Sequence, residues 1–205
     1  KTFYIPIFFI SPEGKRTRMI WDLAAKVNNR CLNDELLGGP NLYNDILKIN
    51  FQMSEHPYLL KGDVQEMFHQ VRLKEEDTDS LRFIFRFKGE GKIRVFKMLV
   101  LPFGARCSPA ISQYVKNLIA YENLESKDLA AKVVLNSTYV DDVVKSFRDK
   151  EVAKETFHDI RQMLKSGGFS LLKINSNDKT LTSDLRKSLA AEGLLEERVI
   201  TAEKQ

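Results

Sequence analysis

Two adjacent aspartates, Asp141 and Asp142, interrupt an apolar run with a strong preference for β structure, between Val133-Val134-Leu135 and Val143-Val144. Carboxylates at this position allow two interpretations. One is a type I′ hairpin turn, in which Asp is common, although such turns prefer a glycine at the second position and none is present. The other is a metal site, because two like charges between apolar strands need a cation to neutralise them, and hard oxygen ligands suit Mg²⁺. The local sequence gives the two interpretations about equal weight.

Asp63 provides another carboxylate, at the end of the predicted strand Tyr58-Leu59-Leu60-Lys61-Gly62. Taken alone, it is an ordinary strand-terminal residue. If this strand neighbours the hairpin around Asp141 in a sheet, however, Asp63 and Asp141 lie side by side. Two or three carboxylates at one sheet edge can hold two metal ions about 3.5–4 Å apart, which activate an attacking oxygen and stabilise the leaving oxygen in phosphoryl transfer.

Hydrophobic periodicity and turn residues predict the elements that position these carboxylates. Ser108 and Pro109 begin a helix that runs to about Tyr121, and Asp149 caps another to about Lys165, which Gly167-Gly168 ends. A further helix is expected at about 41–51, and the tail at 181–205 is expected to be helical and polar, with no obvious surface to bury it. The predicted strands are His56–Asp63, Leu81–Phe87, Ile93–Leu99, Lys132–Tyr139, Val143–Phe147 and Phe169–Ile174.

The order of these elements predicts an α+β fold. With the hairpin at 81–99 taken as an insertion, the order from residue 56 is strand, helix, strand, strand, helix, strand. This is the ferredoxin-like split βαβ arrangement, a sheet with two helices. Because this arrangement hosts many chemistries, it does not define the function.

Composition limits the classes of protein that the chain can belong to. Its 205 residues are 43% hydrophobic and 29% charged, which suits a packed core. The net charge of +4 is compatible with a nucleic-acid partner. Two cysteines without Cys-x-x-Cys spacing exclude a disulfide scaffold. No apolar run approaches the roughly 18 residues of a membrane span, so no membrane partner is expected. Since the chain starts without Met, we expect it to be an excerpt from a longer protein.

Five segments, in order from about Tyr4 to Asn177, resemble the fingers and palm of a reverse transcriptase, most like those of the Pao/BEL group of LTR retrotransposons. Each segment alone is a weak or moderate signal, but five in the right order are strong. They are Arg18-Met19-Ile20-Trp21-Asp22, similar to a fingers motif; Asp63 to Val71, similar to the first catalytic motif; Leu101 to Pro109, similar to the Pro-x-Gly…Ser-Pro motif; Tyr139-Val140-Asp141-Asp142, similar to the Tyr-x-Asp-Asp box; and Gly167 to Lys173 with Asn175-Ser176-Asn177, similar to the fourth motif.

The resemblance implies a division of the chain into subdomains. Fingers would occupy 1–55, and the palm would follow at 56–80 with the first catalytic motif. A fingers-like hairpin insertion at 81–105 would precede the rest of the palm at 106–178. The start of a thumb or connector, or a tail, would occupy 179–205.

The resemblance also implies template-directed DNA synthesis from dNTPs by a two-metal mechanism, with Asp63, Asp141 and Asp142 as the catalytic residues. Asp63 and Asp141 would bind two Mg²⁺ ions, for which Mn²⁺ can substitute. The carbonyl of Val64 would complete one metal site, and Asp142 would support it. Lys173 would be the candidate general acid, with Lys179 as the alternative.

Nucleotide binding is implied for a further group of residues. Arg18, with Lys15 or Arg16, would grip the triphosphate. Phe68 would be the steric gate that excludes a ribose 2′-hydroxyl, and the alternative for this residue is a core aromatic. The other implied contacts are the backbone amides of Gln65, Glu66, Met67 and Phe68 to the phosphates, Phe103 and Gly104 to the nucleotide, and Tyr139 to the primer end.

The implied partners are an RNA or DNA template with its primer, dNTPs, and the remainder of a polyprotein that carries a thumb, RNase H and integrase. The implied location is the cytoplasm, in a retrotransposon particle, or the nucleus. The alternative function is a catalytically inactive or domesticated reverse-transcriptase-like module that binds nucleic acid. An RNA-dependent RNA polymerase is disfavoured, because such an enzyme must admit the 2′-hydroxyl that Phe68 would exclude.

Overall fold

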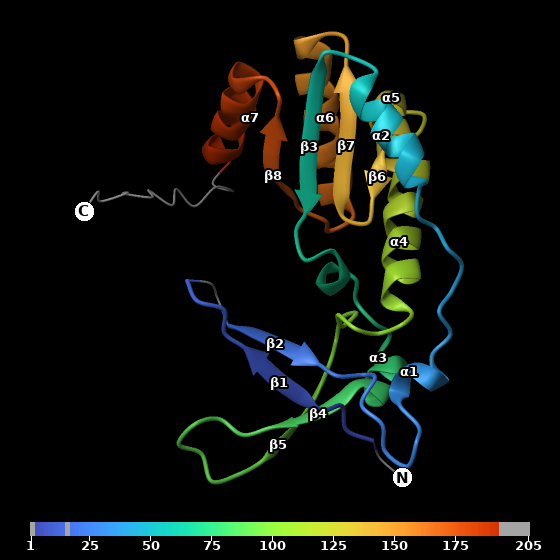
Figure 1. The fold of residues 1–205 in the computed structure, drawn as a ribbon, viewed down its shortest axis with the longest axis vertical. Helices are drawn as coiled ribbons and strands as arrows, with labels where there is room; N and C mark the ends of the chain where they lie inside the picture. The colour runs from blue at the N-terminus through green and yellow to red at the C-terminus, as the bar shows by residue number, and fades with distance from the viewer. Residues whose placement is uncertain (1–2, 15–16, 193–205) are drawn as a thin grey trace, which may run out of the picture. The chain divides into compact units, whose positions relative to one another are not determined.

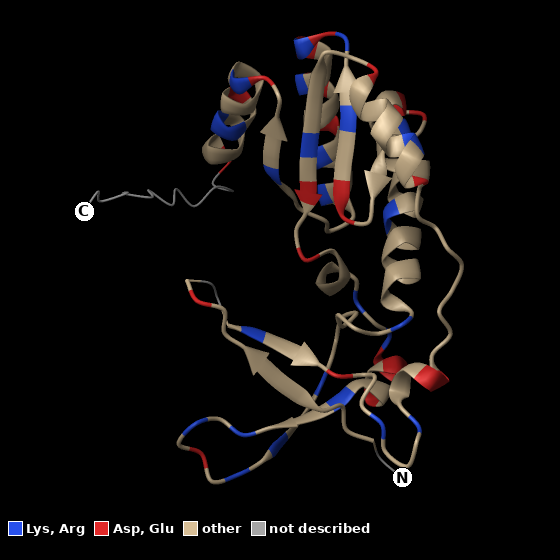
Figure 2. Ribbon diagram, viewed as in Figure 1, with Lys and Arg blue, Asp and Glu red and all other residues tan. Residues whose placement is uncertain are grey.

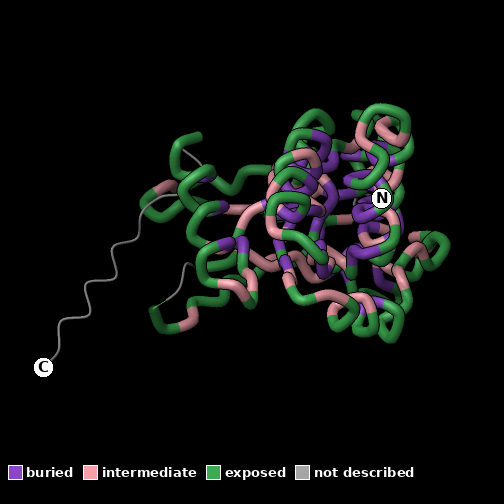
Figure 3. Tube along the Cα trace, turned by 90° about the horizontal axis from the view of Figure 1, so that it is seen from above, coloured by how far each residue is buried: buried purple, intermediate pink, exposed green. Residues whose placement is uncertain are grey.

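The computed structural model describes residues 3–14 and 17–192 of the chain. These residues form two compact units, each made of two separate stretches of sequence. Of the described residues, unit 1 comprises 3–14, 17–42 and 66–118, and unit 2 comprises 43–65 and 119–192. Figure 1 shows the elements of both units and Figure 3 marks their buried positions.

Unit 2 contains a four-stranded antiparallel sheet in the order β6-β7-β3-β8. The long central strand β3 (Tyr58–Val64) pairs with β7 (Asp142–Phe147) on one side and with the edge strand β8 (Leu171–Ser176) on the other. The second edge strand, β6, consists of Thr138–Tyr139 alone. The neighbouring position predicted for the strand of Asp63 and the hairpin of Asp141 is therefore observed.

The helix α6 (Lys150–Ser166) packs against β3, β7 and β8. The Asp149 side chain caps it by accepting hydrogen bonds from the amides of Glu151 and Val152. This satisfies two of the amides that a helix N-terminus leaves without intrahelical partners. Its buried face includes Phe157, Ile160 and Leu164. The predicted helix and its cap are confirmed, and its end at Gly167 agrees with the prediction.

The strand predicted at Lys132–Tyr139 is wrong, because Asp128–Asn136 form the helix α5. A short apolar run does not distinguish a strand from a buried helical segment by periodicity alone. The buried face of α5 consists of Ala130, Ala131, Val133 and Val134, and it packs against α6. This packing outweighs the preference of valine for β-strands. The strand keeps only its last two residues, Thr138 and Tyr139.

The helix predicted in the tail is observed, since Lys179–Ala191 form α7, but this helix is amphipathic rather than polar throughout. Leu181, Leu185 and Leu189 are buried at four-residue spacing, and α7 packs against β8 and α6. The expectation that the tail has no surface to bury it is therefore wrong for α7, and the rest of that expectation, at 193–205, lies outside the described residues. The helix expected at 41–51 is observed as α2 (Ile46–Ser54), which Asp45 caps.

Unit 1 contains two separate antiparallel pairs of strands. Strand β1 (Ile7–Ile10) pairs with β2 (Arg18–Trp21), and β4 (Arg82–Phe85) pairs with β5 (Arg94–Lys97), which is the predicted hairpin. A cluster of buried side chains forms its core, namely Ile5, Leu23, Leu81, Phe83, Met98 and Ala105.

Short helices complete unit 1: α1 (Leu32–Glu35), α3 (Glu75–Thr78) and the 3-10 turns Met67–Gln70 and Asp79–Leu81. The helix α4 (Ser108–Glu122) begins in this unit, as predicted from Ser108 and Pro109, and its residues beyond Leu118 belong to unit 2. The Ser108 hydroxyl donates to the carbonyl of Pro102 (2.7 Å), which fixes the loop before α4. Together, the two units confirm the α+β class.

Candidate functional site

Three carboxylates gather at one end of β3 and β7. Asp63 is the register partner of Asp142, and opposed residues of antiparallel strands have Cα atoms about 4.5–5.5 Å apart. The amide of Val64 donates to the carbonyl of Asp141 (2.8 Å), which ties the turn to the end of β3. Figure 2 shows the acidic ends of the two strands side by side. The structure thus brings together the three aspartates that the sequence analysis selects.

The turn that carries Asp141 is not the type I′ turn considered above. Tyr139 pairs with Asp142, so Val140 and Asp141 are its two central residues. Type I′ requires positive φ at both, whereas here only Val140 has one, at 55°. A β-branched residue rarely adopts this conformation, and such strain costs on the order of 1–3 kcal/mol and is found most often at functional sites.

Two lysines neutralise part of this carboxylate cluster. The Nζ atom of Lys61 lies 2.7 Å from Oδ2 of Asp142, and Nζ of Lys173 lies 3.0 Å from both carboxylate oxygens of Asp63. Sequence reasoning missed Lys61. The available signal is its position two residues before Asp63, which places it on the same face of β3.

A β-bulge directs Lys173 towards Asp63. Lys61 pairs with Asn175, but Asp63 pairs with Leu172, so β8 has one extra residue opposite Gly62. Lys173 has a φ of 53°, as expected where a strand accommodates an extra residue, and a bulge changes the direction in which a side chain points. The close approach of Gly62 to the core supports this arrangement. A Cβ atom there would lie 3.1 Å from side-chain atoms of Leu171 and Phe157.

The electrostatics of the cluster favour a cation. Burial raises the pKa of Asp141 above its usual range, the charges of Asp63 and Asp142 raise it further, and Lys173 partly opposes them. Among the residues that the structure describes, no three His, Cys, Asp or Glu side chains are arranged to hold a metal ion. The donor chemistry of the three carboxylates nevertheless fits a hard divalent cation, which would compete with Lys61 and Lys173 for their oxygens.

Unit 1 brings together part of the predicted nucleotide-binding set. The rings of Phe68 and Phe103 lie 5.0 Å apart, and the ring of His69 lies 4.7 Å from Phe103 in an edge-on arrangement. Gly104 has a φ of 94°, and a Cβ atom there would lie 3.2 Å from the carbonyl oxygen of Trp21. Glycine suits this position because it adopts a positive φ without strain and has no Cβ atom to crowd the Trp21 carbonyl. His69 joins this aromatic cluster, which sequence reasoning did not anticipate.

The remaining predicted contacts have varied surroundings. Arg18 is exposed at the start of β2, whereas Lys15 and Arg16 lie outside the described residues. The amide of Gln65, one of the four expected to contact the phosphates, donates to the carbonyl of Ser170 (2.9 Å). Met67 is buried and Glu66 is exposed with a φ of 47°. Tyr139 is partly exposed, with its ring 6.2 Å from that of Tyr43.

Comparison with known families identifies the class of protein. Residues 12–183 match the family described as reverse transcriptase (RNA-dependent DNA polymerase). The chain therefore belongs to the reverse transcriptase family, as the order of its motifs predicted. No curated protein sequence is significantly similar to the chain.

Solved structures with a similar fold include the prototype foamy virus protease-reverse transcriptase. The native viral protein is 19% identical, with a TM-score of 0.59 over 82% of this chain and 20% of the viral chain. The same values hold for the complex with an RNA/DNA hybrid, except that 83% of this chain is covered. A complex with double-stranded DNA has 20% identity and a TM-score of 0.57, over 82% of this chain and 26% of the viral one.

These similarities show that the chain has the fold of a reverse transcriptase domain. The chain spans about a fifth of the length of the first viral chains it matches. None of the helices in the described part of the chain combines the length and the apolar character that crossing a membrane requires.

Proposed function

We propose that the chain carries out template-directed DNA synthesis from dNTPs on an RNA or DNA template with a primer. The observation that carries this proposal is the opposition of Asp63 and Asp142 across β3 and β7, next to Asp141, in a member of the reverse transcriptase family. The viral relatives were solved with an RNA/DNA hybrid and with double-stranded DNA, which supports the same class of partner here.

Asp63, Asp141 and the Val64 carbonyl would hold two Mg²⁺ ions, for which Mn²⁺ can substitute, and Asp142 would support them. When bound, such a pair supplies activation of the attacking oxygen and stabilisation of the leaving oxygen. The carboxylates supply the negative charge that binds the cations. Lys61 and Lys173 hold two of these carboxylates in place before the metal binds.

The other residues would bind and orient the nucleotide and the primer. Arg18, with Lys15 or Arg16, would bind the triphosphate, since guanidinium geometry matches phosphate oxygens. Phe68, held against Phe103, would exclude a 2′-hydroxyl by its bulk. Gly104 would allow a close approach of the backbone to the nucleotide. Tyr139 would contact the primer end.

Lys173 is our candidate for the group that protonates the departing pyrophosphate, supported by its two contacts to Asp63. Its ion pair shows that the long side chain reaches the carboxylate cluster. General acids of this kind typically accelerate a reaction by about 10²–10⁴-fold.

The wider setting of the chain is also a proposal. We infer a retrotransposon polyprotein of the Pao/BEL type, whose thumb, RNase H and integrase would complete the protein, acting in cytoplasmic particles or in the nucleus. The five motifs in order support it. The fingers at 1–55 and 81–105 and the palm at 56–80 and 106–178 are our proposed subdomains, with a thumb or connector beginning at 179.

Primer extension on an RNA template tests the proposed activity. With Mg²⁺ or Mn²⁺, we expect incorporation of dNTPs that is lost in Asp141→Asn but retained in the control Asp128→Asn, which removes an exposed carboxylate of α5. Equal incorporation by wild type and Asp141→Asn would contradict the assignment. The alternative, an inactive module that binds nucleic acid, predicts binding of the primer-template without incorporation by either protein.

The steric gate has its own test. Phe68→Ala should admit ribonucleotides, measured as a fall in the ratio of dNTP to rNTP incorporation, because the bulk that meets the 2′-position is removed. Phe83→Leu, in the buried core of unit 1, is the matched control for loss of an aromatic ring. Unchanged sugar selectivity in Phe68→Ala would refute the gate.

A further inference from the structure

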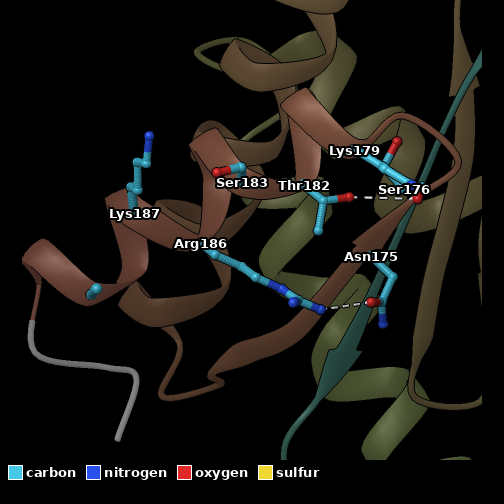
Figure 4. Close-up of a pocket in the computed structure, with 8 residues that line it drawn as sticks. Asn175, Ser176, Lys179, Thr182, Ser183, Arg186 and Lys187 are labelled. Atoms are coloured by element: carbon cyan, nitrogen blue, oxygen red, sulfur yellow. Dashed lines mark hydrogen bonds between the residues drawn. The ribbon is translucent and has the colours of Figure 1, made fainter. Parts of the chain in front are cut away.

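A surface pocket of about 530 Å³ lies between the edge strand β8 and the helix α7 (Figure 4). It is separate in sequence from the aspartates, and none of the three lines it. Three of its lining residues are cationic and the rest are polar or small. They are Asn175, Ser176, Lys179, Thr182, Ser183, Arg186, Lys187 and Ala190.

The amphipathic character of α7 explains this composition. Its leucines at 181, 185 and 189 are buried against the rest of unit 2. The pocket residues of the helix recur at spacings of three and four, so they share one face and line the space beside β8. Figure 2 shows the basic positions along α7.

The wall of the pocket is held by hydrogen bonds between the two elements. The guanidinium of Arg186 donates to the side-chain oxygen of Asn175 (2.9 Å) and to the carbonyl of Ile174 (3.3 and 3.4 Å). Figure 4 shows Arg186 reaching from α7 towards Asn175. Because all these acceptors are neutral, the bonds orient the guanidinium but leave its charge in the pocket uncompensated.

The carboxylates nearest in sequence neutralise the pocket only in part, because Asp184 also interacts electrostatically with Lys187. Asp178 pairs with Lys150 (2.7 Å), and Asp184 pairs with Lys154 (2.8 Å). Neither lines the pocket, so its own three cations face no lining carboxylate. A concave site with three positive charges and several hydroxyl and amide groups is suited to an anion.

We propose that this β8–α7 pocket binds the phosphodiester backbone of a nucleic acid, as a contact additional to the aspartate site. Lys179 and Lys187 are eight residues apart on one helix, about 12 Å along its axis at 1.5 Å per residue. Measured along the axis of a duplex, that length corresponds to three to four phosphates of one strand, at about 3.4 Å of axis per phosphate. The choice of a nucleic acid over another polyanion rests on the proposed function.

Salt-dependent binding tests the pocket. We compare wild type, Lys179→Gln/Lys187→Gln and the charge-matched control Lys48→Gln/Lys132→Gln, using fluorescence anisotropy of a labelled DNA duplex with a recessed primer end. Each lost phosphate contact reduces the magnitude of the slope of log affinity against log salt by about 0.9. The slope of the pocket variant should therefore be smaller in magnitude by about 1.8, and the slope of the control should not change. Between about 50 and 200 mM salt, wild type should therefore lose about ten-fold more affinity than the pocket variant.

A second variant separates charge from folding. Lys179→Arg/Lys187→Arg should retain the wild-type slope, because the charge is kept. The proposal is overturned if the salt-dependence slope of the glutamine variant equals that of the control. Poly-glutamate is the second polyanion to test. If the glutamine variant binds poly-glutamate more weakly but binds DNA as the wild type does, the proposal is also overturned. Asp141→Asn should keep the wild-type slope. Incorporation of dNTPs is measured on the wild type, so the two failures are distinguishable. Incorporation by the wild type, together with a glutamine variant that keeps the slope of the control, overturns this proposal alone. A wild type that does not incorporate dNTPs but whose slope still depends on Lys179 and Lys187 overturns the proposed function alone.

Discussion

Gly62→Ala should destabilise the sheet of unit 2 through packing alone. The backbone of Gly62 is not in the left-handed region, so alanine introduces no strain in φ. Its Cβ atom would lie 3.1 Å from Leu171 and from Phe157, which are 2% and 3% exposed. Neither side chain is free to move into solvent, so the core must shift to admit the methyl group.

The magnitude follows from two opposing effects. Overpacking of a core costs about 1–3 kcal/mol. Replacing glycine by alanine at a compatible backbone position stabilises by about 0.4–1 kcal/mol, because the unfolded chain loses conformational freedom. The net expectation is a loss of about 1–2 kcal/mol in the free energy of unfolding. Because Gly62 lies opposite the bulge, dNTP incorporation should fall as well.

Urea unfolding followed by far-UV circular dichroism measures this loss. Gly91→Ala is the matched control, since its Cβ atom would meet nothing within 4 Å and its φ is also unrestricted. The double variant Gly62→Ala/Leu171→Val removes one carbon where the other adds one, so it should recover part of the lost stability. Equal stability of the Gly62→Ala and Gly91→Ala proteins would refute the packing argument.

Three further outcomes can be checked by unfolding experiments. Asp149→Ala should cost about 1 kcal/mol, because the cap of α6 is lost, whereas Asp149→Asn should retain most of it. Asp141→Asn should be more stable than wild type at pH 7. Because the folded state raises the pKa of Asp141, the wild type loses stability as pH rises above the ordinary range of an Asp pKa. The difference in the free energy of unfolding between the two proteins should therefore vanish below that range. Burial lowers the pKa of Lys116 to about 8, so the free energy of unfolding of the wild type should increase as pH rises from about 8 towards 10. The Lys116→Met variant should not show this increase. The same pH dependence in that variant would exclude Lys116 as its cause.

Local signals in the sequence predicted those parts of the fold that local chemistry determines. Asp149 and the glycines after Lys165 bounded α6 correctly because capping depends on neighbouring residues. Residues 132–136 are helical because their conformation depends on packing against α6, a later segment of the chain. Similarly, the leucines of α7 are recognisable as an apolar face, but only the folded sheet provides the surface that they cover.

The acidic cluster was predictable, but its cationic neighbours were only partly so. The adjacent pair Asp141 and Asp142 is recognisable because two carboxylates interrupt an apolar run, and Asp63 was selected through its expected position beside them in the sheet. Lys173 was selected through the family resemblance, but its contact with Asp63 depends on a bulge that one extra residue creates. The spacing of two residues places Lys61 on the face of Asp63, but its pairing with Asp142 depends on the register between β3 and β7. Register is a property of the assembled sheet rather than of either segment.

The central position of β3 in the sheet has a consequence for folding during synthesis on the ribosome. This strand is translated before both of its neighbours, and the contact between Asp63 and Lys173 joins residues 110 positions apart. At about 5–20 residues per second, β3 waits roughly 5–20 s for β8 to be translated. Before β7 and then β8 are translated, the apolar residues of β3 lack one or both neighbouring strands and are prone to aggregation, so we expect the nascent chain to depend on chaperones until synthesis has passed β8.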